Sequence, residues 1–153
     1  ICLMPCNLFG PNDNYDLKNS HFIPALIKKI YLKSNDKKNK IIKLWGTGRP
    51  LREVLYVDEV ANACEFFLRK KIKDSLINIG SSTEMTIKNY ANFIKNKIDP
   101  IIKIKFDNNL KLDGVKRKKL DVSLANKYGW NSKMNFSEAI DKTIQAFKIS
   151  KKH

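Results

Sequence analysis

The chain has 153 residues, of which 42% are hydrophobic and 29% are charged. This length and balance fit a globular region with its own core and exclude a chain that is disordered throughout. No apolar run approaches the roughly 20 residues that a membrane-spanning helix needs, and the first residues show neither the basic region nor the small-residue cleavage site of a secretory signal.

Basic residues outnumber acidic ones by 30 to 15, which gives a net charge of +15. Such a charge favours an anionic partner, either a nucleic acid or a small molecule. Most of the basic residues are lysines, and asparagine and isoleucine are also abundant, a composition typical of AT-rich genomes. Because no nucleic-acid-binding motif is present, an anionic small molecule is the better expectation, and a basic nucleic-acid-binding module stays open as an alternative.

Residues 1–9 form an apolar run rich in branched and aromatic side chains, which predicts a buried strand. Gly10 and Pro11 end this strand, since proline fixes φ and lacks the N–H donor of a sheet ladder. The asparagines and aspartates of residues 12–19 predict a polar loop.

A helix is predicted from about Ile23 to Leu32, with Ser20 as its N-cap and Pro24 in its first turn, where a missing N–H costs least. His21 therefore lies where a loop enters a helix, beyond the carboxyl end of a strand. In open α/β sheets this edge is where ligands bind, so His21 is a candidate site residue, although a lone histidine is more often structural.

The middle of the chain predicts two extended segments. Residues 41–45 and 51–57 read as strands, and the turn between them suggests a hairpin-like connection. Within the turn, Gly46 and Gly48 lack the third glycine and the following helix of a dinucleotide-binding fingerprint, so that interpretation is rejected.

Strands and helices alternate through the rest of the chain, which predicts an α/β fold. The remaining predicted elements are a helix over 59–70 with Asp58 as N-cap, a strand over 76–79, a helix from Thr86 to Ile98, a strand over 101–106, a short helix from Asp121 or Ser123 to Gly129, and a last helix with Ser137 as N-cap.

The three cysteines, Cys2, Cys6 and Cys64, show no metal-binding spacing and no CxxC motif. Cys2 and Cys6 would lie on the same face of the first strand. We expect all three to be buried, free thiols in a reducing cytoplasm, and we expect no metal site.

Several motifs occur in an order that resembles one enzyme family. NLFGP at 7–11, NSH at 19–21 and IPAL at 23–26 resemble the GDP-L-fucose synthases, NADP-dependent epimerase-reductases of the extended short-chain dehydrogenase/reductase group. The resemblance continues with WGTG at 45–48, REVLYVD at 52–58, INIG at 77–80, DG at 113–114, RK at 117–118 and LD at 120–121.

The sequence also departs from the family pattern. Val115 and Lys116 replace Thr-Pro, Cys6 stands where Thr is usual, and Tyr56 stands where His is frequent. The family's G-x-x-G-x-x-G phosphate cradle and its Tyr-x-x-x-Lys pair do not occur in the 153 residues, and neither do the family's Ser and catalytic Cys that precede that Tyr.

The resemblance implies the C-terminal part of such an enzyme, with strands of an incomplete Rossmann sheet and a small α/β substrate-binding domain. On this pattern, residues 1–10 are the last part of the NADP-binding domain, and residues 11–153 form mainly the substrate-binding domain, with 54–80 returning to the Rossmann domain. Since the sequence opens inside an apparent strand at Ile1, we expect a fragment whose upstream part is absent.

The resemblance also implies the site residues. His21 is the acid of the epimerisation and also borders the cofactor. The other implied residues are Pro5, Cys6, Asn7 and Leu8 for the nicotinamide end of NADP, and Lys29, Trp45, Arg52 and Asp113 for the substrate.

The chemistry of the four substrate residues suits a nucleotide sugar. The Arg52 guanidinium matches phosphate oxygens, Lys29 offers a point charge, Trp45 gives a flat wall, and Asp113 can accept bonds from hydroxyl or guanine donors. Each also has a structural alternative: a surface ion pair with a neighbouring glutamate for Arg52, a solvated lysine for Lys29, core filling for Trp45 and an Asp-Gly turn for Asp113.

The function implied by the resemblance is conversion of GDP-4-keto-6-deoxy-D-mannose to GDP-L-fucose, by epimerisation at C3 and C5 and reduction at C4 with NADPH. We expect a GDP-sugar substrate, no nucleic-acid or membrane partner, a cytoplasmic homodimer when complete, and a fragment that is inactive alone. Another NAD(P)-dependent nucleotide-sugar epimerase or dehydratase, and a non-catalytic structural remnant, remain as alternatives.

Overall fold

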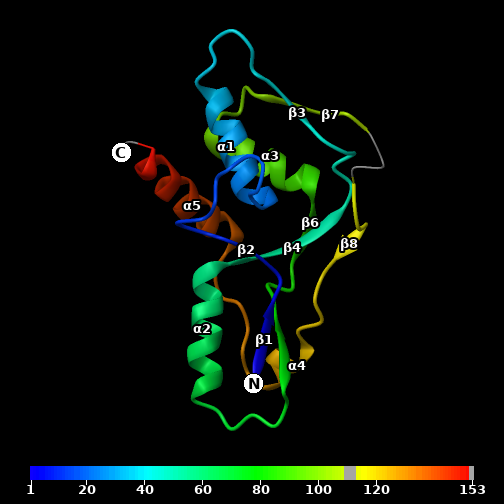
Figure 1. Cartoon of the computed structure of the whole chain (residues 1–153), viewed down its shortest axis with the longest axis vertical. Helices are drawn as coiled ribbons and strands as arrows, with labels where there is room; N and C mark the ends of the chain where they lie inside the picture. Colours follow the sequence, from blue (N-terminus) through cyan, green and yellow to red (C-terminus); the bar gives the residue numbers. More distant parts are fainter. Residues whose placement is uncertain (109–112, 152–153) are drawn as a thin grey trace. The chain divides into compact units, whose positions relative to one another are not determined.

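The computed structural model describes residues 1–108 and 113–151 (Figure 1). The chain divides into two compact units: unit 1 contains residues 1–11, 52–84 and the chain from 118 onward, and unit 2 contains residues 12–51 and 85–117. Strands and helices alternate, which confirms the predicted α/β class. Which segments bind NADP and which bind substrate stays a prediction.

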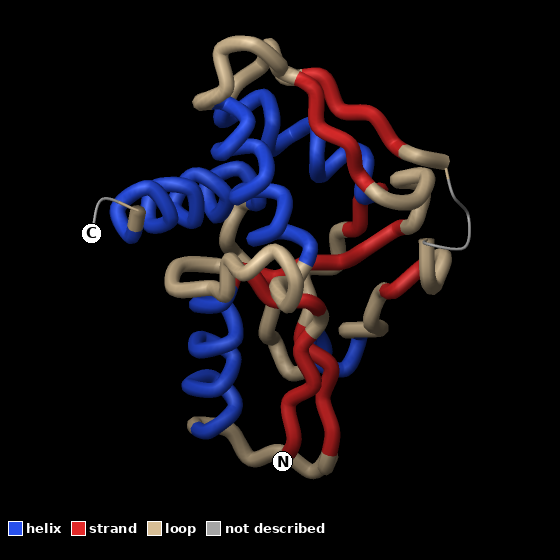
Figure 2. Tube along the Cα trace, turned by 45° about the horizontal axis from the view of Figure 1, so that its top comes forward, coloured by secondary structure: helices blue, strands red, loops and turns tan. Residues whose placement is uncertain are grey.

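Unit 1 contains a two-stranded sheet and strands of a four-stranded sheet, and each sheet includes a parallel strand pair (strands are red in Figure 2). Strand β1 (Cys2–Pro5) runs parallel to β5 (Leu76–Ile79), with Cys2 opposite Leu76. Strand β2 (Asn7–Phe9) runs parallel to β4 (Leu51–Tyr56), with Asn7 opposite Val54.

The single strand predicted over residues 1–9 is wrong, because the chain changes its pairing partner at Cys6. Pro5 has no N–H to donate, so it suits the end of the β1 ladder. The Cys6 N–H then donates to the Ile79 carbonyl at 2.9 Å, and the residues after it pair with β4 instead of β5.

Helix α2 (Val57–Leu68) follows β4 directly. Its N-cap is Tyr56, so the predicted cap at Asp58 is wrong. Asp58 lies in the first turn, where its negative charge interacts favourably with the helix dipole. The helix covers a core that joins it to β4, β5 and the segment near Trp130: Leu55, Ala63, Phe67, Ile77, Ile79, Ala125 and Trp130.

The last part of unit 1 contains α4 (Ser123–Lys127) and α5 (Phe136–Ser150). Gly129 follows α4 with φ +92°, and the Gly129 and Trp130 N–H groups donate to the carbonyls of the helix end at 2.9 and 3.0 Å. This left-handed cap confirms the predicted helix end. The predicted cap of α5 at Ser137 is wrong, because Asn135 is the N-cap and accepts the Ser137 N–H at 2.8 Å.

Unit 2 packs helices against a parallel strand pair. Helix α1 (Phe22–Ser34) contacts α3 (Ile87–Ile98) and strand β3 (Ile41–Leu44), and β3 pairs in parallel with β7 (Lys103–Phe106). The predicted apolar stripe of α1 is buried: Ile23, Leu26, Ile27 and Ile30. The short strands β6 (Glu84–Thr86) and β8 (Arg117–Lys118) contain two of the points at which the chain passes between units.

The hairpin-like connection predicted after residue 45 is wrong. Strand β3 pairs with β7 and strand β4 with β2, so the turn joins strands that belong to different pairs. The predicted Ser20 cap is also wrong. His21 is the N-cap of α1 and makes no side-chain cap bond, while the Ser20 hydroxyl is buried with no partner in the described chain. Thr86, by contrast, caps α3 as predicted and accepts the Asn89 N–H at 3.1 Å.

The three cysteines are free, as predicted, but their predicted burial is wrong for two of them. Cys2 and Cys64 are exposed and Cys6 is half-buried. Cys2 lies on the face of β1 opposite to Leu3, which packs on the core. Because the strand ends before Cys6, Cys2 and Cys6 do not share one strand face.

Candidate functional site

Unit 2 brings three of the four predicted substrate residues to one turn. Trp45 follows β3 directly, and the next residues, Gly46 to Gly48, form a turn in which both glycines have positive φ, +74° and +71°. Asp113 reaches this turn from far along the chain. Its carboxylate accepts the Thr47 N–H and the Thr47 hydroxyl, each at 2.6 Å.

Trp45 is 74% exposed, which rules out core filling as its role. The Lys29 ammonium nitrogen lies 5.1 Å from the centre of the Trp45 ring, within the range of a cation–π contact. Lys29 is half-buried on α1, beside the buried Ile30, so it is held against the ring and is not a fully solvated lysine.

A shallow pocket of about 350 Å³ adjoins this lysine. It lies between the second half of α1 and strand β3, and its lining residues are Lys29, Leu32, Lys33, Asp36, Ile41, Ile42 and Lys43. Lysines outnumber acidic residues in this lining, which favours an anionic ligand over a cationic one.

His21 is exposed at the first turn of the same helix that carries Lys29. Its backbone carbonyl accepts the Ala25 N–H at 3.0 Å, the first bond of α1. Because its imidazole makes no cap bond, the side chain does not stabilise the start of the helix. This leaves the ring available for chemistry.

Unit 1 holds the remaining predicted residues and also a buried carboxylate that sequence reasoning missed. Glu53 is fully buried. Its two oxygens accept the backbone N–H groups of Ser82 and Leu120 at 2.8 and 2.9 Å. A Cβ on Gly80 would collide with the same carboxylate, so this position requires glycine. The available signal was a charged residue directly before the apolar run that ends β4.

Asn7 and Arg52 are both linked to Glu53 through the backbone. The Asn7 amide nitrogen donates to the Glu53 backbone carbonyl at 3.1 Å, which ties β2 to β4 through a side chain. Arg52 precedes Glu53 in the strand, so the two side chains point to opposite faces. Arg52 is half-buried.

Pro5, Cys6, Asn7 and Leu8 are all half-buried and span the switch from β1 to β2. Burial, together with the negative charge of Glu53, raises the pKa of the Cys6 thiol to about 12. The thiol is therefore neutral at physiological pH, and Cys6 is not a nucleophile. This segment presents an uncharged surface.

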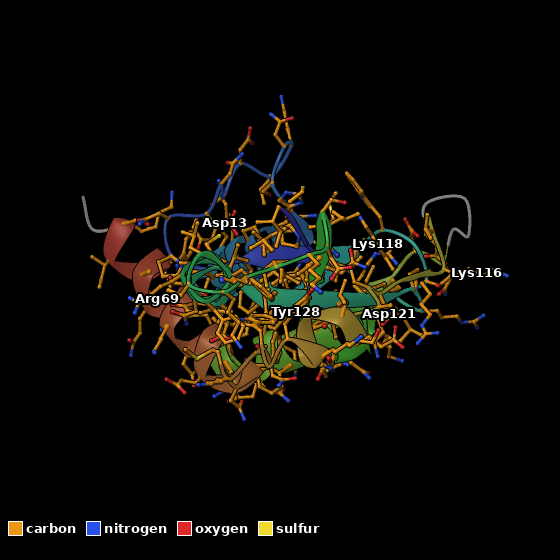
Figure 3. All side chains as sticks on the ribbon, turned by 90° about the horizontal axis from the view of Figure 1, so that it is seen from below. Asp13, Arg69, Lys116, Lys118, Asp121 and Tyr128 are labelled. Carbon is orange, nitrogen blue, oxygen red and sulfur yellow. The ribbon has the colours of Figure 1, made fainter. Side chains whose placement is uncertain are left out.

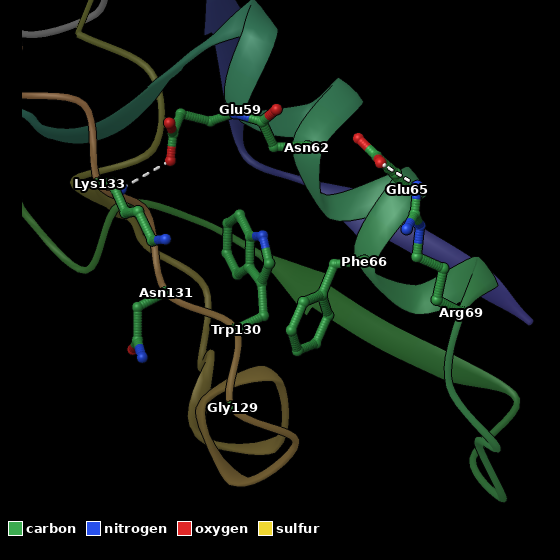
Figure 4. A pocket seen from close by; sticks show the side chains of 9 residues that line it. All are labelled: Glu59, Asn62, Glu65, Phe66, Arg69, Gly129, Trp130, Asn131 and Lys133. Carbon is green, nitrogen blue, oxygen red and sulfur yellow. Dashed lines mark hydrogen bonds and ion pairs between the residues drawn. The ribbon is translucent and has the colours of Figure 1, made fainter.

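A larger pocket, of about 420 Å³, lies in unit 1 and contains none of the predicted residues (Figure 4). Trp130 and Phe66 line it, and the Lys133 N–H donates to the Glu59 carboxylate at 2.7 Å. Glu65 and Arg69, which pair at 2.6 Å, stand at its α2 side. Trp130 is only 5% exposed, so its ring serves mainly the core.

Over residues 1–108 and 113–151, no group of three or more His, Cys, Asp or Glu side chains is placed to hold a metal ion. None of the helices in these ranges has the length and hydropathy for a membrane crossing.

Comparison with known proteins gives related enzymes. Residues 1–80 match the profile of the NAD dependent epimerase/dehydratase family. The chain is 38% identical over 140 residues to GDP-L-fucose synthase 1 of Arabidopsis thaliana, a match that covers 92% of this chain and 43% of the relative. It is 33% identical over 145 residues to GDP-L-colitose synthase of Yersinia pseudotuberculosis, covering 94% of this chain and 46% of the relative.

Among solved structures, the fold is similar to a GDP-L-fucose synthetase from Naegleria fowleri bound to NADP, with a TM-score of 0.84 and 26% identity. That match covers 98% of this chain and 45% of the other. The chain thus spans less than half the length of these relatives.

Proposed function

Because the chain belongs to the NAD dependent epimerase/dehydratase family, we propose that it supplies the substrate side of an NADP-dependent epimerase-reductase that makes GDP-L-fucose from GDP-4-keto-6-deoxy-D-mannose. The observation that carries this proposal is the exposed Trp45 with the Lys29 ammonium 5.1 Å from its ring, on a turn held by Asp113. An exposed aromatic face beside a cation suits a nucleoside diphosphate. The relatives named GDP-L-fucose synthase support the choice of nucleotide sugar.

In this proposal, the family resemblance gives Lys29 and Arg52 each as a ligand of the diphosphate and Trp45 as a contact of the rest of the GDP. A guanidinium offers parallel donors to two phosphate oxygens, and an ammonium adds a point charge. The net charge of +15 draws such an anion toward the chain. The substrate, a cytoplasmic location and a homodimeric complete enzyme are parts of the same proposal.

The residues Pro5 to Leu8 fit one end of NADP. The nicotinamide carboxamide is uncharged, and this half-buried segment, with its neutral Cys6 thiol and the Asn7 amide, presents no charge to it. When bound, NADPH supplies the hydride that reduces C4. Neither the phosphate-cradling glycine motif nor the Tyr-x-x-x-Lys pair occurs in the sequence, so we propose that the chain alone does not turn over.

We assign His21 the role of proton donor in the epimerisation. Loss of a proton beside the 4-keto group leaves an enolate, and inversion requires protonation from the opposite face. A protonated imidazole can deliver that proton as a general acid. His21 is exposed at the start of α1, on the same helix as Lys29, which supports this role.

The β1–β5 pair supports a chain that forms one part of a larger fold. Parallel sheets are normally covered on both faces. One face of this pair packs on the core of unit 1, whereas the other leaves Met4 47% and Leu76 50% exposed, with Ile1 62% exposed beside them. In the proposal, further elements of the NADP-binding domain cover this face.

Replacing Arg52 with Met tests the substrate assignment. The test uses a chimeric enzyme, defined as the Arabidopsis relative with its matching segment replaced by this chain. Loss of a charge-assisted bond to phosphate should weaken GDP binding by about 1.5–3 kcal/mol, which is roughly 10- to 150-fold in Kd. Isothermal titration calorimetry measures this change, and NADPH affinity should stay nearly constant.

The matched control is Arg69→Met, which removes an exposed arginine that pairs with Glu65 on α2. It should leave GDP binding unchanged.

The alternative function, a basic nucleic-acid-binding module, is tested with the same proteins. Lys116 and Lys118 are exposed and could contact a nucleic acid (Figure 3). Normal GDP affinity in the Arg52 variant, combined with DNA binding that falls steeply with salt, would favour the nucleic-acid-binding module instead.

A further inference from the structure

The turn that carries Trp45 is held by two carboxylates, and one of them, Asp107, belongs to no motif of the family resemblance. The Gly46 N–H donates to the Asp107 carboxylate at 2.8 Å, and the Thr47 N–H donates to Asp113 at 2.6 Å. Successive amides of the turn are thus each bound by a different acidic side chain. The Thr47 hydroxyl adds a bond to the second Asp113 oxygen at 2.6 Å.

Backbone bonds fix the same turn from neighbouring segments. The Gly46 carbonyl accepts the Asn108 N–H at 3.1 Å, and the Gly48 carbonyl accepts the Lys88 N–H at 2.9 Å. Gly46 is buried, and a Cβ there would collide with the Asp113 carboxylate. The peptide that follows Trp45 therefore has one orientation, and this fixes the direction in which the chain leaves the tryptophan.

Trp45 stays 74% exposed although its large apolar ring would gain by folding back onto the protein. The Lys29 contact alone is a weak restraint, worth about 0.5–1 kcal/mol at an exposed site. The bonds to Asp107 and Asp113 are charge-assisted and stronger. They fix the backbone beside Trp45 before any ligand arrives, and the Lys29 contact restrains the ring itself.

We propose that Asp107 and Asp113 are positioning residues that hold the Trp45 turn ready for the GDP part of the substrate. This rests on the proposed function. Asp113 then acts on the ligand through Thr47 and Trp45, and not as a direct ligand of ribose or guanine. Both of its oxygens hold the turn through Thr47, which supports this assignment, and since each oxygen keeps a second lone pair, the second test below decides whether a ligand also binds there.

The first test measures the mobility of the Trp45 ring in the 153-residue chain. The sequence has two tryptophans, so a Trp130→Phe background leaves Trp45 as the sole tryptophan, which is excited selectively at a wavelength that tyrosine does not absorb. Asp107→Ala, Asp113→Ala and Thr47→Val should each lower the fluorescence anisotropy of Trp45. Thr47→Ser keeps the hydroxyl and should restore the wild-type value.

Asp99→Ala is the matched control, because Asp99 also binds a backbone N–H, that of Ile101 at 3.0 Å, within unit 2. It should lower stability without changing the anisotropy. Thr47→Val removes one hydroxyl, which donates to Asp113 and accepts the Arg49 N–H, and it keeps both aspartates, so it remains informative if an aspartate variant fails to fold. Unchanged anisotropy in folded Thr47→Val and in every folded aspartate variant would overturn the proposal.

The second test separates positioning from direct contact by a double-mutant cycle on GDP affinity, measured by calorimetry. Asp113→Ala alone should weaken GDP binding about 10-fold, the loss of one charge-assisted interaction. In a Trp45→Ala background it should cause no further loss, because its effect passes through that ring. If the fold-losses of GDP affinity in the two single variants multiply in the double variant, Asp113 is a direct ligand and the proposal is overturned.

If the wild-type chain and the chimeric enzyme both fail to bind GDP, the proposed function fails. The anisotropy measurement still decides whether the two carboxylates position Trp45.

Discussion

Replacing His21 with Gln in the chimeric enzyme is expected to slow epimerisation by roughly 10²–10⁴-fold, the usual contribution of a general acid. Glutamine keeps some hydrogen bonding but cannot deliver a proton at neutral pH. The side chain of His21 makes no cap bond to α1, so the substitution should leave the helix intact. The loss should therefore be chemical and not a loss of folding.

Solvent deuterium incorporation at C3 and C5 of the sugar, followed together with NADPH consumption, measures this effect. Reduction at C4 relies on the relative's half of the chimera and should survive better, so the variant should release unepimerised or partly epimerised sugars. Lys18→Gln, which removes an exposed charge from the loop before His21, is the control and should change neither rate. Normal deuterium exchange with a normal yield would leave His21 a structural residue. Loss of NADPH binding along with exchange would make it a cofactor-site residue.

Replacing Glu53 with Ala is expected to lower the free energy of unfolding by about 3–5 kcal/mol, since hydrogen bonds to a charged group contribute about 1.5–3 kcal/mol each. The substitution leaves the Ser82 and Leu120 N–H groups without their acceptor, in a site where Glu53 itself is fully buried. It also opens a cavity beside Gly80. Urea denaturation followed by circular dichroism measures the change.

Glu65→Ala is the control for Glu53, because Glu65 is an exposed carboxylate of the same unit that pairs with Arg69. A surface pair of this kind contributes about 0–1 kcal/mol. Glu53→Gln keeps one acceptor oxygen and should fall between wild type and the alanine variant. A loss below about 1 kcal/mol for Glu53→Ala would mean that its bonds to the two amides contribute little to unit 1.

Local patterns were sufficient for several elements. The apolar stripe of α1, the Thr86 cap of α3 and the left-handed Gly129 after α4 depend on residues within a few positions of each other, and all were predicted correctly. The α/β class follows from the same local alternation.

Strand pairing could not be predicted in this way. The break at Cys6 exists because β1 pairs with β5 and β2 with β4, partners far away in the sequence. The hairpin prediction failed for the same reason, since β3 finds its partner in β7. A single apolar run carries no signal for a change of partner.

The candidate site was also only partly visible in the sequence. The motif resemblance identified Lys29 and Trp45, but their contact depends on how α1 packs beside β3. Asp107 carried no signal in the sequence, because its bond to Gly46 joins residues that follow the carboxyl ends of β3 and β7, two parallel strands that are far apart in the sequence. Glu53 looked like a surface partner for Arg52, and only the fold reveals that backbone amides enclose its carboxylate.

The most direct measurement gives the chimeric enzyme GDP-4-keto-6-deoxy-D-mannose and NADPH and identifies the product by chromatography and NMR. The central claim, that this chain supplies the substrate side of the enzyme, predicts GDP-L-fucose formed in equal amount to the NADPH consumed. A folded chimera that binds NADPH but forms no GDP-L-fucose, under conditions in which the intact Arabidopsis enzyme does, would contradict that claim.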